Sequence, residues 1–207
     1  MRPHIILNLS MSLDGRVDDE TDVLSNKLND YRIELIRKDV DAILTTAAYV
    51  NHQNPTFPCA DPDKRIAIYL IDKTVETNPK VDLIGKGSFD VSLVVPVNAI
   101  KSRIAALQGA KPDLKLIYNG DSAINIEELL WKLNKDGVHS ILLEADYQTS
   151  MKMLNFKLVD DLYVLVSPLI IGSKRSAFEG AFDSSIGLNL DGITQYGDFV
   201  LLHYNLR

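Results

Sequence analysis

Polar side chains that could bind or act on a ligand cluster near the amino end of the chain, directly after an apolar run. They are the amide of Asn8, the hydroxyls of Ser10 and Ser12, the carboxylate of Asp14 and the guanidinium of Arg16. Because these groups combine donors, acceptors and both charges, they can orient a polyhydroxylated ligand. The order Ser-x-Asp-Gly is also that of an ordinary tight turn, so a purely structural role stays open at this point.

A second polar segment, Pro168–Ser176, ends in a glycine, two cations and two hydroxyls. The backbone N–H groups of Gly172 and Ser173 can direct a phosphate, and the two cations can supply charge. The segment lacks the helix signature that follows a Walker motif, so a solvated turn is an equal alternative.

Two carboxylates, Glu144 and Asp146, follow the apolar run Ile141–Leu143, where they could form an acid pair at the edge of a sheet. The simpler expectation is that Asp146 is exposed. The four histidines share no spacing typical of a zinc site, and the single Cys59 excludes a site built from several cysteines. We therefore expect no metal.

Apolar runs and helical periodicity predict strands and helices in alternation. The strands expected are 5–9, 41–46, 65–71, 90–95, 114–118, 140–144, 161–167 and 198–204. Helices are expected from residue 25, over 97–107, from 126 to near 137 and over 148–157, whereas the prolines within 49–63 predict a long loop. The pattern indicates a single α/β domain over residues 1–207, with a mostly parallel sheet, flanking helices and a C-terminal antiparallel hairpin. In such sheets ligands bind beyond the carboxyl ends of the strands.

The composition limits the class of protein further. Hydrophobic residues make up 46% and charged residues 24% of the 207-residue chain, as in ordinary globular proteins. The formal net charge of −6 disfavours binding to nucleic acid. The apolar runs are far shorter than the roughly 20 residues that span a bilayer, and nothing resembles a signal peptide. We expect a cytoplasmic protein that binds a small molecule rather than nucleic acid or a membrane.

Several short motifs are specific when their order and spacing are taken together. They are Ser12–Arg16, Ile36–Leu44, Asn54 with Pro55, Arg65–Ile68 with Asp72, Gly137–Glu144, Leu158–Leu162 and Pro168–Gly172. In these motifs the chain resembles the riboflavin-biosynthesis reductases, meaning the reductase domain of the bifunctional bacterial deaminase-reductase and its stand-alone archaeal and fungal relatives. The likeness covers nearly the whole chain and implies a dihydrofolate-reductase-like fold.

The resemblance implies an NADPH-dependent reduction. The substrate would be a ribosylamino-pyrimidine 5′-phosphate, or a related pyrimidine or pteridine-like compound, and the product its ribitylamino form. The resemblance implies substrate binding by Asn8, Ser12 and Arg16, and a proton-handling catalytic role for Asp14. Cofactor binding is implied at Thr45, Thr46, Glu144, Ala145, Asp146, Gly172 and Ser173.

The chain departs from the family pattern at two turns. Thr45–Tyr49 stands where the family has a glycine-containing turn, and Ala145–Tyr147 stands where glycines let backbone amides approach a pyrophosphate. These departures support an alternative, a non-catalytic ligand-binding protein of the same fold that has lost dinucleotide binding. A flavin in the cleft is a third possibility. The resemblance also implies a homodimer, which would cover the aliphatic C-terminal strands.

Overall fold

The computed structural model describes residues 1–17, 24, 27–86, 89–172, 174–180, 182 and 184–207. The chain divides into two compact units, residues 1–4 with 34–146 and residues 5–33 with 147–207. The first unit holds strands β2 to β6, and the second holds β7 to β9 and almost all of β1. Helix α1 (Lys27–Asp39) begins in the second unit and ends in the first.

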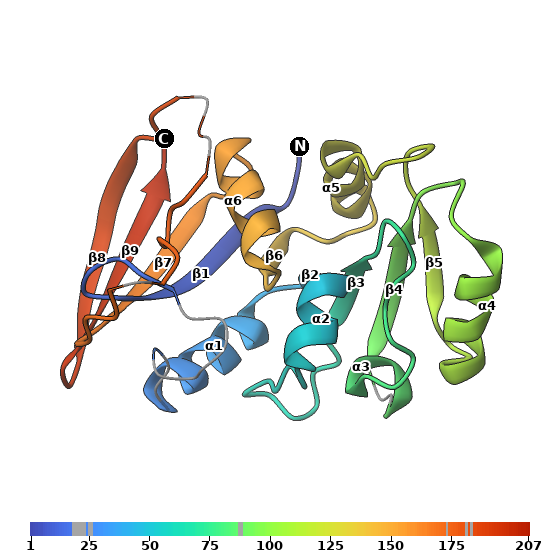
Figure 1. Ribbon diagram of the computed structural model, residues 1–207, viewed down its shortest axis with the longest axis horizontal. Helices are drawn as coiled ribbons and strands as arrows, with labels where there is room; N and C mark the ends of the chain where they lie inside the picture. Colours follow the sequence, from blue (N-terminus) through green and yellow to red (C-terminus); the bar gives the residue numbers. More distant parts are fainter. Residues whose placement is uncertain (18–23, 25–26, 87–88, 173, 181, 183) are drawn as a thin grey trace. The chain divides into compact units, whose positions relative to one another are not determined.

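The first unit is built from parallel strands with helices between them (Figure 1). Its strands are β2 (Ala42–Thr46), β3 (Ala67–Ile71), β4 (Asp90–Val95), β5 (Lys115–Tyr118) and β6 (Ser140–Leu143). Its helices are α2 (Ala47–Gln53), α3 (Asp82–Gly85), α4 (Lys101–Ala110) and α5 (Ile126–Lys135). Every side chain of β2 and nearly every one of β4 and β6 is buried, as expected for parallel strands covered on both faces.

The strand order in the first unit reverses once. The strands pair in the order β5-β4-β3-β2-β6, all parallel. The chain therefore runs outward from β2 to β5 and then returns to place β6 on the other side of β2. The carboxyl ends of β2 and β6 therefore lie at a topological switch point, which is where open α/β sheets bind their ligands.

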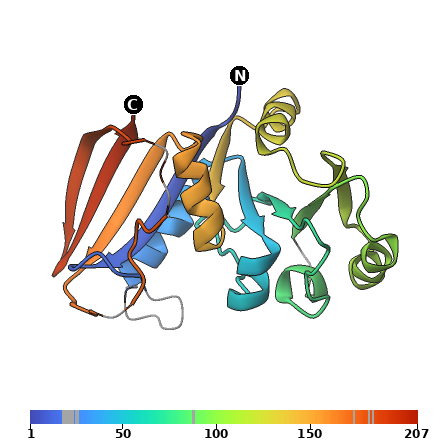
Figure 2. The ribbon, with the colours of Figure 1, turned by 45° about the horizontal axis from the view of Figure 1, so that its top comes forward.

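The second unit combines parallel and antiparallel pairing. Strand β1 (His4–Ser12) runs parallel to β7 (Asp161–Ser167), which pairs antiparallel with β9 (Phe199–Leu206). Strand β8 (Leu188–Tyr196) completes a hairpin with β9 through a two-residue turn at Gly197, whose φ of 61° suits glycine. Helix α6 (Tyr147–Asn155) lies against β1 and β7 in the two views (Figures 1 and 2).

The structure confirms the predicted α/β class, with a mostly parallel sheet, flanking helices and a C-terminal antiparallel hairpin. Two predictions of detail were wrong. The expected loop over 49–63 begins with the last turns of α2, which Thr46 caps, and strand β8 was not predicted at all. Residues 25 and 26, where α1 was expected to begin, lie outside the described residues. The single domain over 1–207 stays a prediction, and no helix in the described part is long and apolar enough to cross a membrane.

Candidate functional site

The loop after β1 is organised around a buried serine. The side chain of Ser12 is fully buried, and its hydroxyl donates to Oδ1 of Asp14 at 2.5 Å. The same Oγ accepts the backbone N–H of Arg16 at 2.9 Å. Gly15 adopts a φ of 70°, which closes the turn between them. The predicted segment is therefore a tight turn, and it also gathers three of the predicted site residues.

Asp14 ties this loop to the segment that follows β7. Its Oδ1 accepts the N–H of Ile171 at 3.1 Å, and its Oδ2 accepts the N–H of Gly172 at 2.9 Å. Gly172, with a φ of 80°, was predicted to offer its N–H to a phosphate. In this structure the chain's own carboxylate accepts that N–H, and Ser173 lies outside the described residues.

The hydrogen bonds to Asp14 lower the pKa of its carboxyl to about 2, chiefly through the Ser12 hydroxyl and next through the N–H of Gly172. A carboxyl with so low a pKa is ionised at neutral pH and accepts hydrogen bonds instead of donating a proton. These contacts favour an anchoring role for Asp14. The proton-handling role stays a prediction.

The lowered pKa predicts how the loop responds to acid. The stabilisation that ionised Asp14 provides is complete at pH values above 3.8, the ordinary pKa of the group. It is lost only as the pH falls through about 2. We expect a carbon NMR titration of the Asp14 carboxyl to have its midpoint near 2, and Ser12→Ala to move it upward. A midpoint near the ordinary 3.8 in the unmodified protein would contradict the hydrogen-bond geometry.

Asn8 lies within β1, inside the strand predicted over residues 5–9. Its Oδ1 accepts a hydrogen bond from Nη2 of Arg32, which also donates to Asn29 at 2.8 Å. The Arg32 guanidinium lies over the ring of Tyr163, 5.1 Å from its centre. The structure thus joins Ser12, Asp14 and Gly172, and places Asn8 in a separate polar cluster.

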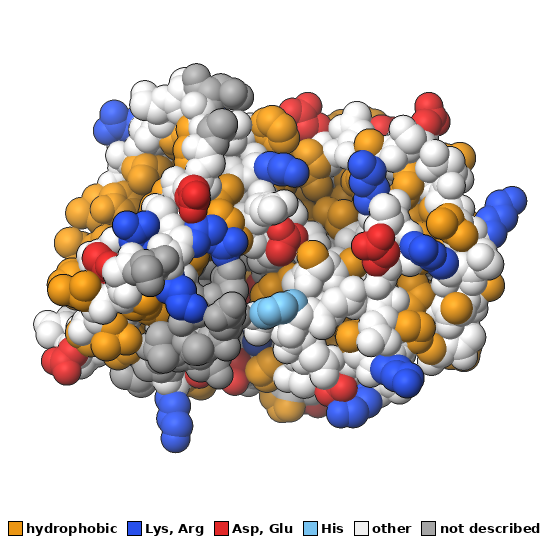
Figure 3. Space-filling model, in the orientation of Figure 1, with side chains coloured by type: hydrophobic (Ala, Val, Ile, Leu, Met, Phe, Trp, Pro, Cys, Tyr) orange, Lys and Arg blue, Asp and Glu red, His pale blue; other side chains and the backbone are white. Residues whose placement is uncertain are grey.

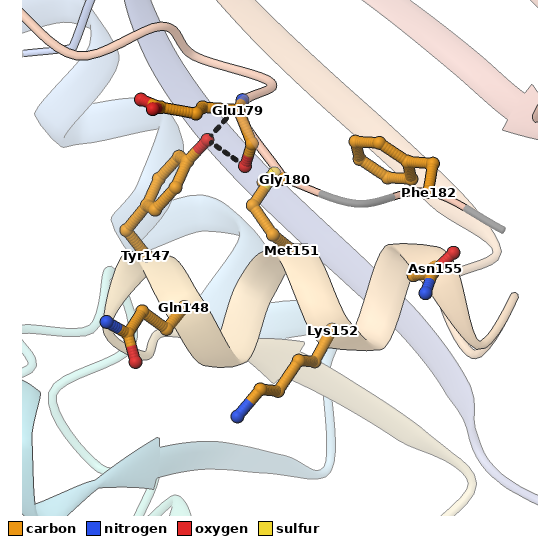
Figure 4. A pocket seen from close by; sticks show the side chains of 8 residues that line it. All are labelled: Tyr147, Gln148, Met151, Lys152, Asn155, Glu179, Gly180 and Phe182. Carbon is orange, nitrogen blue, oxygen red and sulfur yellow. Dashed lines mark hydrogen bonds between the residues drawn. The ribbon is translucent and has the colours of Figure 1, made fainter.

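Tyr147, the first residue of α6, fixes the segment that follows Gly172. Its hydroxyl donates toward the carbonyl oxygens of Ser176 (2.9 Å) and Glu179 (2.8 Å) and accepts the N–H of Glu179 at 2.5 Å. The Arg175 guanidinium lies over its ring at 4.0 Å. Figure 4 shows the hydroxyl turned toward Glu179 at one end of a cavity of about 270 Å³, which is lined by α6 and by Glu179, Gly180 and Phe182. No local sequence pattern indicates this contact.

In the first unit, a hydrogen bond spans the switch point between β2 and β6. Oγ1 of Thr46 caps α2 by accepting the N–H of Tyr49 at 3.3 Å, and it donates to Oδ2 of Asp146 at 2.8 Å. Asp146 is half-buried, and its own N–H points back to Oγ1 of Thr46 at 3.4 Å. Two of the predicted cofactor residues are therefore bonded to each other.

Glu144 forms a buried ion pair at the same corner. Nε and Nη2 of Arg37 each lie 2.7 Å from one of its carboxylate oxygens, and the two side chains are 9% and 10% exposed. Nη1 of Arg37 also donates to the carbonyl of Pro58 at 2.8 Å. Burial lowers the pKa of Arg37, but the hydrogen bond and charge of Glu144 outweigh it and leave that pKa above its usual value.

The charge of Glu144 also affects the pKa of Tyr49. Burial, followed by the charge of Glu144, raises the pKa of the Tyr49 phenol to about 12, so it stays a neutral donor at neutral pH. The sequence placed Arg37 in a family motif but assigned it no role in the site. Its role depends on contact with a residue 107 positions away, which no local pattern indicates.

The two remaining predicted cofactor residues differ in exposure. Thr45 is fully buried in β2, and its Oγ1 has no hydrogen-bond partner in the described part of the chain. Ala145 is half-buried and offers a small side chain beside the switch point.

Two side-chain groups at the switch point that could bind the diphosphate of a dinucleotide are already used within the chain. A diphosphate needs N–H donors and cations. Here the Thr46 hydroxyl already donates to Asp146, and the Arg37 guanidinium is paired with Glu144. We therefore assign no catalytic step to a cofactor bound at this corner.

Solved structures of other proteins share this fold. RibD from Acinetobacter baumannii superposes with a TM-score of 0.81 at 16% identity, over 100% of this chain and 58% of that chain. Dihydrofolate reductase from Enterococcus faecalis superposes with a TM-score of 0.52 at 9% identity, over 99% and 96% of the two chains. The fold is thus dihydrofolate-reductase-like, as predicted, and the chain spans little more than half of the RibD chain.

The chain belongs to the RibD C-terminal domain family, whose model matches residues 3–202. A relative that matches from end to end is the 2,5-diamino-6-ribosylamino-4(3H)-pyrimidinone 5′-phosphate reductase of Methanothermobacter thermautotrophicus. It is 24% identical over 219 aligned residues, which cover 100% of both chains. The family predicted from the motifs is therefore confirmed.

Proposed function

We propose that this protein is an oxidoreductase of riboflavin biosynthesis that reduces a ribosylamino-pyrimidine 5′-phosphate to its ribitylamino product. The observation that carries the proposal is the match to the Methanothermobacter reductase over the full length of both chains. We propose NADPH as the hydride donor, in line with the resemblance.

The proposed reduction adds a hydride to one carbon of the substrate and a proton to the neighbouring nitrogen. In its ring-opened form the ribosylamino group carries a C=N bond, so the two additions convert an imine to an amine. NADPH would supply the hydride. The chain has to bind and orient the sugar phosphate.

We assign that task to the loop after β1. Ser12 and Asp14 fix the loop, and Nε of Arg16 has no hydrogen-bond partner among the described residues. A guanidinium held in a fixed loop suits a phosphate or a sugar hydroxyl. Arg16 is therefore the group we propose for recognition of the substrate.

The proposal predicts substrate-dependent oxidation of NADPH by the purified protein. We expect consumption of NADPH absorbance only when the ribosylamino-pyrimidine phosphate is present, with kcat/KM about 100-fold lower for the dephosphorylated compound. Arg16→Ala should weaken this preference for the phosphate. No oxidation above the protein-free rate, at millimolar concentrations of both reactants, would contradict the proposal.

A specific observation favours the alternative, a non-catalytic binding protein of the same fold. At two predicted anion positions, Gly172 and Thr46, a carboxylate of the chain itself accepts the hydrogen bond. Such a protein would bind the pyrimidine phosphate without oxidising NADPH. The same assay, combined with a direct measurement of substrate binding, separates the two functions.

We also propose a homodimer and a cytoplasmic location. Strand β8 is at the edge of the β1-β7-β9-β8 order, and Leu188, Leu190 and Ile193 on it are 37%, 52% and 62% exposed. Figure 3 shows hydrophobic side chains where β8 and β9 lie in Figure 1. An exposed edge strand with apolar side chains favours pairing with another chain.

A further inference from the structure

The loop after β1 pairs with the segment that follows β7, and this pairing places a serine opposite Arg16. Arg16 and Ser176 form an antiparallel bridge. Two backbone hydrogen bonds of 2.9 and 2.8 Å frame the bridge, each donated by the residue that follows one member of the pair. In a bridge of this kind the two opposed side chains lie on the same face, with Cβ atoms about 5 Å apart. The Arg16 guanidinium and the Ser176 hydroxyl therefore project from the same face of the pairing.

The two side chains have unused hydrogen-bond donors. Nε of Arg16 is buried and has no hydrogen-bond partner in the described part of the chain. Ser176 is half-buried, and its hydroxyl makes no hydrogen bond to another described residue. Phosphate oxygens are acceptors, and they bind strongly to a charged donor with a neutral donor beside it. The pair thus matches a phosphate group in both charge and hydrogen bonding.

The hydroxyl of Tyr147 holds the backbone at Ser176. It lies 2.9 Å from the carbonyl oxygen of Ser176 and accepts the N–H of Glu179 at 2.5 Å. Figure 4 shows the contacts of this hydroxyl with the backbone of Glu179. On the other side of Ser176, the carboxylate of Asp14 accepts the N–H of Gly172 at 2.9 Å. The segment is therefore fixed both before and after Ser176.

We infer that Ser176 binds the 5′-phosphate of the substrate together with Arg16, and that Tyr147 is the positioning residue for this contact. The inference rests on the proposed function, because it takes the ribosylamino-pyrimidine phosphate as the ligand of Arg16. The sequence predicted that the N–H of Gly172 directs a phosphate, but Asp14 accepts that N–H. The inference assigns a phosphate contact in the same segment to the hydroxyl of Ser176 instead.

The first test compares Ser176→Thr, which keeps a hydroxyl, with Ser176→Val, which has nearly the same shape and no hydroxyl. Calorimetry gives the dissociation constants of the pyrimidine phosphate and of its dephosphorylated form, and the ratio of the two is the phosphate preference. We expect this preference to fall about tenfold in Ser176→Val and to change less than about twofold in Ser176→Thr. Ser102→Ala, at an exposed position of α4, is the control and should leave the preference unchanged.

The second test concerns the positioning role of Tyr147. Tyr147→Phe removes the hydroxyl and keeps the ring that the Arg175 guanidinium covers at 4.0 Å. We expect the phosphate preference to fall about fivefold. Combining Tyr147→Phe with Ser176→Val should lower it no further than Ser176→Val alone, because Tyr147 acts through Ser176. Tyr118→Phe, at an exposed position at the end of β5, is the matched control.

Four results would contradict the inference. An unchanged phosphate preference in Ser176→Val, or an equal loss in Ser176→Thr, would exclude the hydroxyl as a phosphate ligand. Additive losses in the double variant, or an equal loss of affinity for both compounds in Tyr147→Phe, would show that Tyr147 does not act through Ser176. Ser176→Ala should behave as Ser176→Val, which covers the case in which the branched side chain disturbs the pairing.

The outcomes also separate the inference from the proposed function. A lost phosphate preference in Ser176→Val, with no oxidation of NADPH by the unmodified protein, would leave the inference standing and overturn the function. Reduction of the pyrimidine phosphate by the unmodified protein, with the same phosphate preference in Ser176→Val, would overturn the inference alone. No binding of either compound at millimolar concentration would overturn both.

Discussion

Replacing Arg37 by methionine is expected to lower the free energy of unfolding by about 3–5 kcal/mol, because it leaves the Glu144 carboxylate buried without its partner. The two side chains are 9% and 10% exposed and share two hydrogen bonds of 2.7 Å. Methionine keeps much of the volume of the arginine stem, so the lost charge dominates the effect. Chemical denaturation, analysed where unfolding is two-state, measures the change.

Two variants test the cause of this loss. Arg103→Met replaces an exposed arginine whose contact is to the carbonyl of Thr74, and it should change the free energy of unfolding by less than about 0.5 kcal/mol. Combining Arg37→Met with Glu144→Leu removes both charges and should recover most of the loss. If Arg37→Met lowers the free energy of unfolding by less than about 1 kcal/mol, the Arg37–Glu144 pair does not stabilise the fold as a buried ion pair.

Removing the side chain of Asp14 is expected to reduce kcat/KM for the pyrimidine phosphate about 100-fold, because the loop after β1 and the segment at Gly172 then lose their common acceptor. Small displacements of positioning groups cost rates of this size. Asp14→Asn keeps one oxygen acceptor and should lose only about tenfold. Steady-state kinetics measured across a range of pH give both values.

The pH profile separates positioning from proton handling. If Asp14 positions the loop, the profile of Asp14→Asn keeps its shape while its height falls. If Asp14 handles the proton, Asp14→Asn is as inactive as the variant without the side chain, Asp14→Ala. In that case kcat/KM also no longer falls on one side of its pH optimum. Asp63→Ala, which removes an exposed carboxylate outside the site, serves as the control and should leave kcat/KM unchanged.

Much of the fold could be predicted because the parallel strands are continuous apolar runs. Strand β7 has the predicted bounds Asp161–Ser167, and β4 has the predicted bounds Asp90–Val95. Strand β8 could not be predicted, since most of its side chains are exposed and the register shift between Leu190 and Gly192 interrupts its alternation. Helix α2 was missed because Pro55, Pro58 and Pro62 led to the prediction of a loop over the whole of 49–63, although threonine before two alanines is also a helix start.

In the candidate site, only contacts between residues close together in the sequence could be predicted. Ser12 and Asp14 are two positions apart, so their contact follows from the turn itself. The bonds from Asp14 to Gly172 and from Thr46 to Asp146 join residues 158 and 100 positions apart. The sequence placed all four residues at strand ends, but it could not show that the carboxylates accept the hydrogen bonds expected to serve a phosphate.

The most direct test of the proposed function is mass spectrometry of the pyrimidine product after incubation with NADPH and the purified protein. The account predicts a ribitylamino product that is two hydrogen atoms heavier than the substrate, one of them deuterium when the cofactor carries deuterium at its transferable position. A substrate recovered at its original mass after complete mixing with the protein would contradict the account.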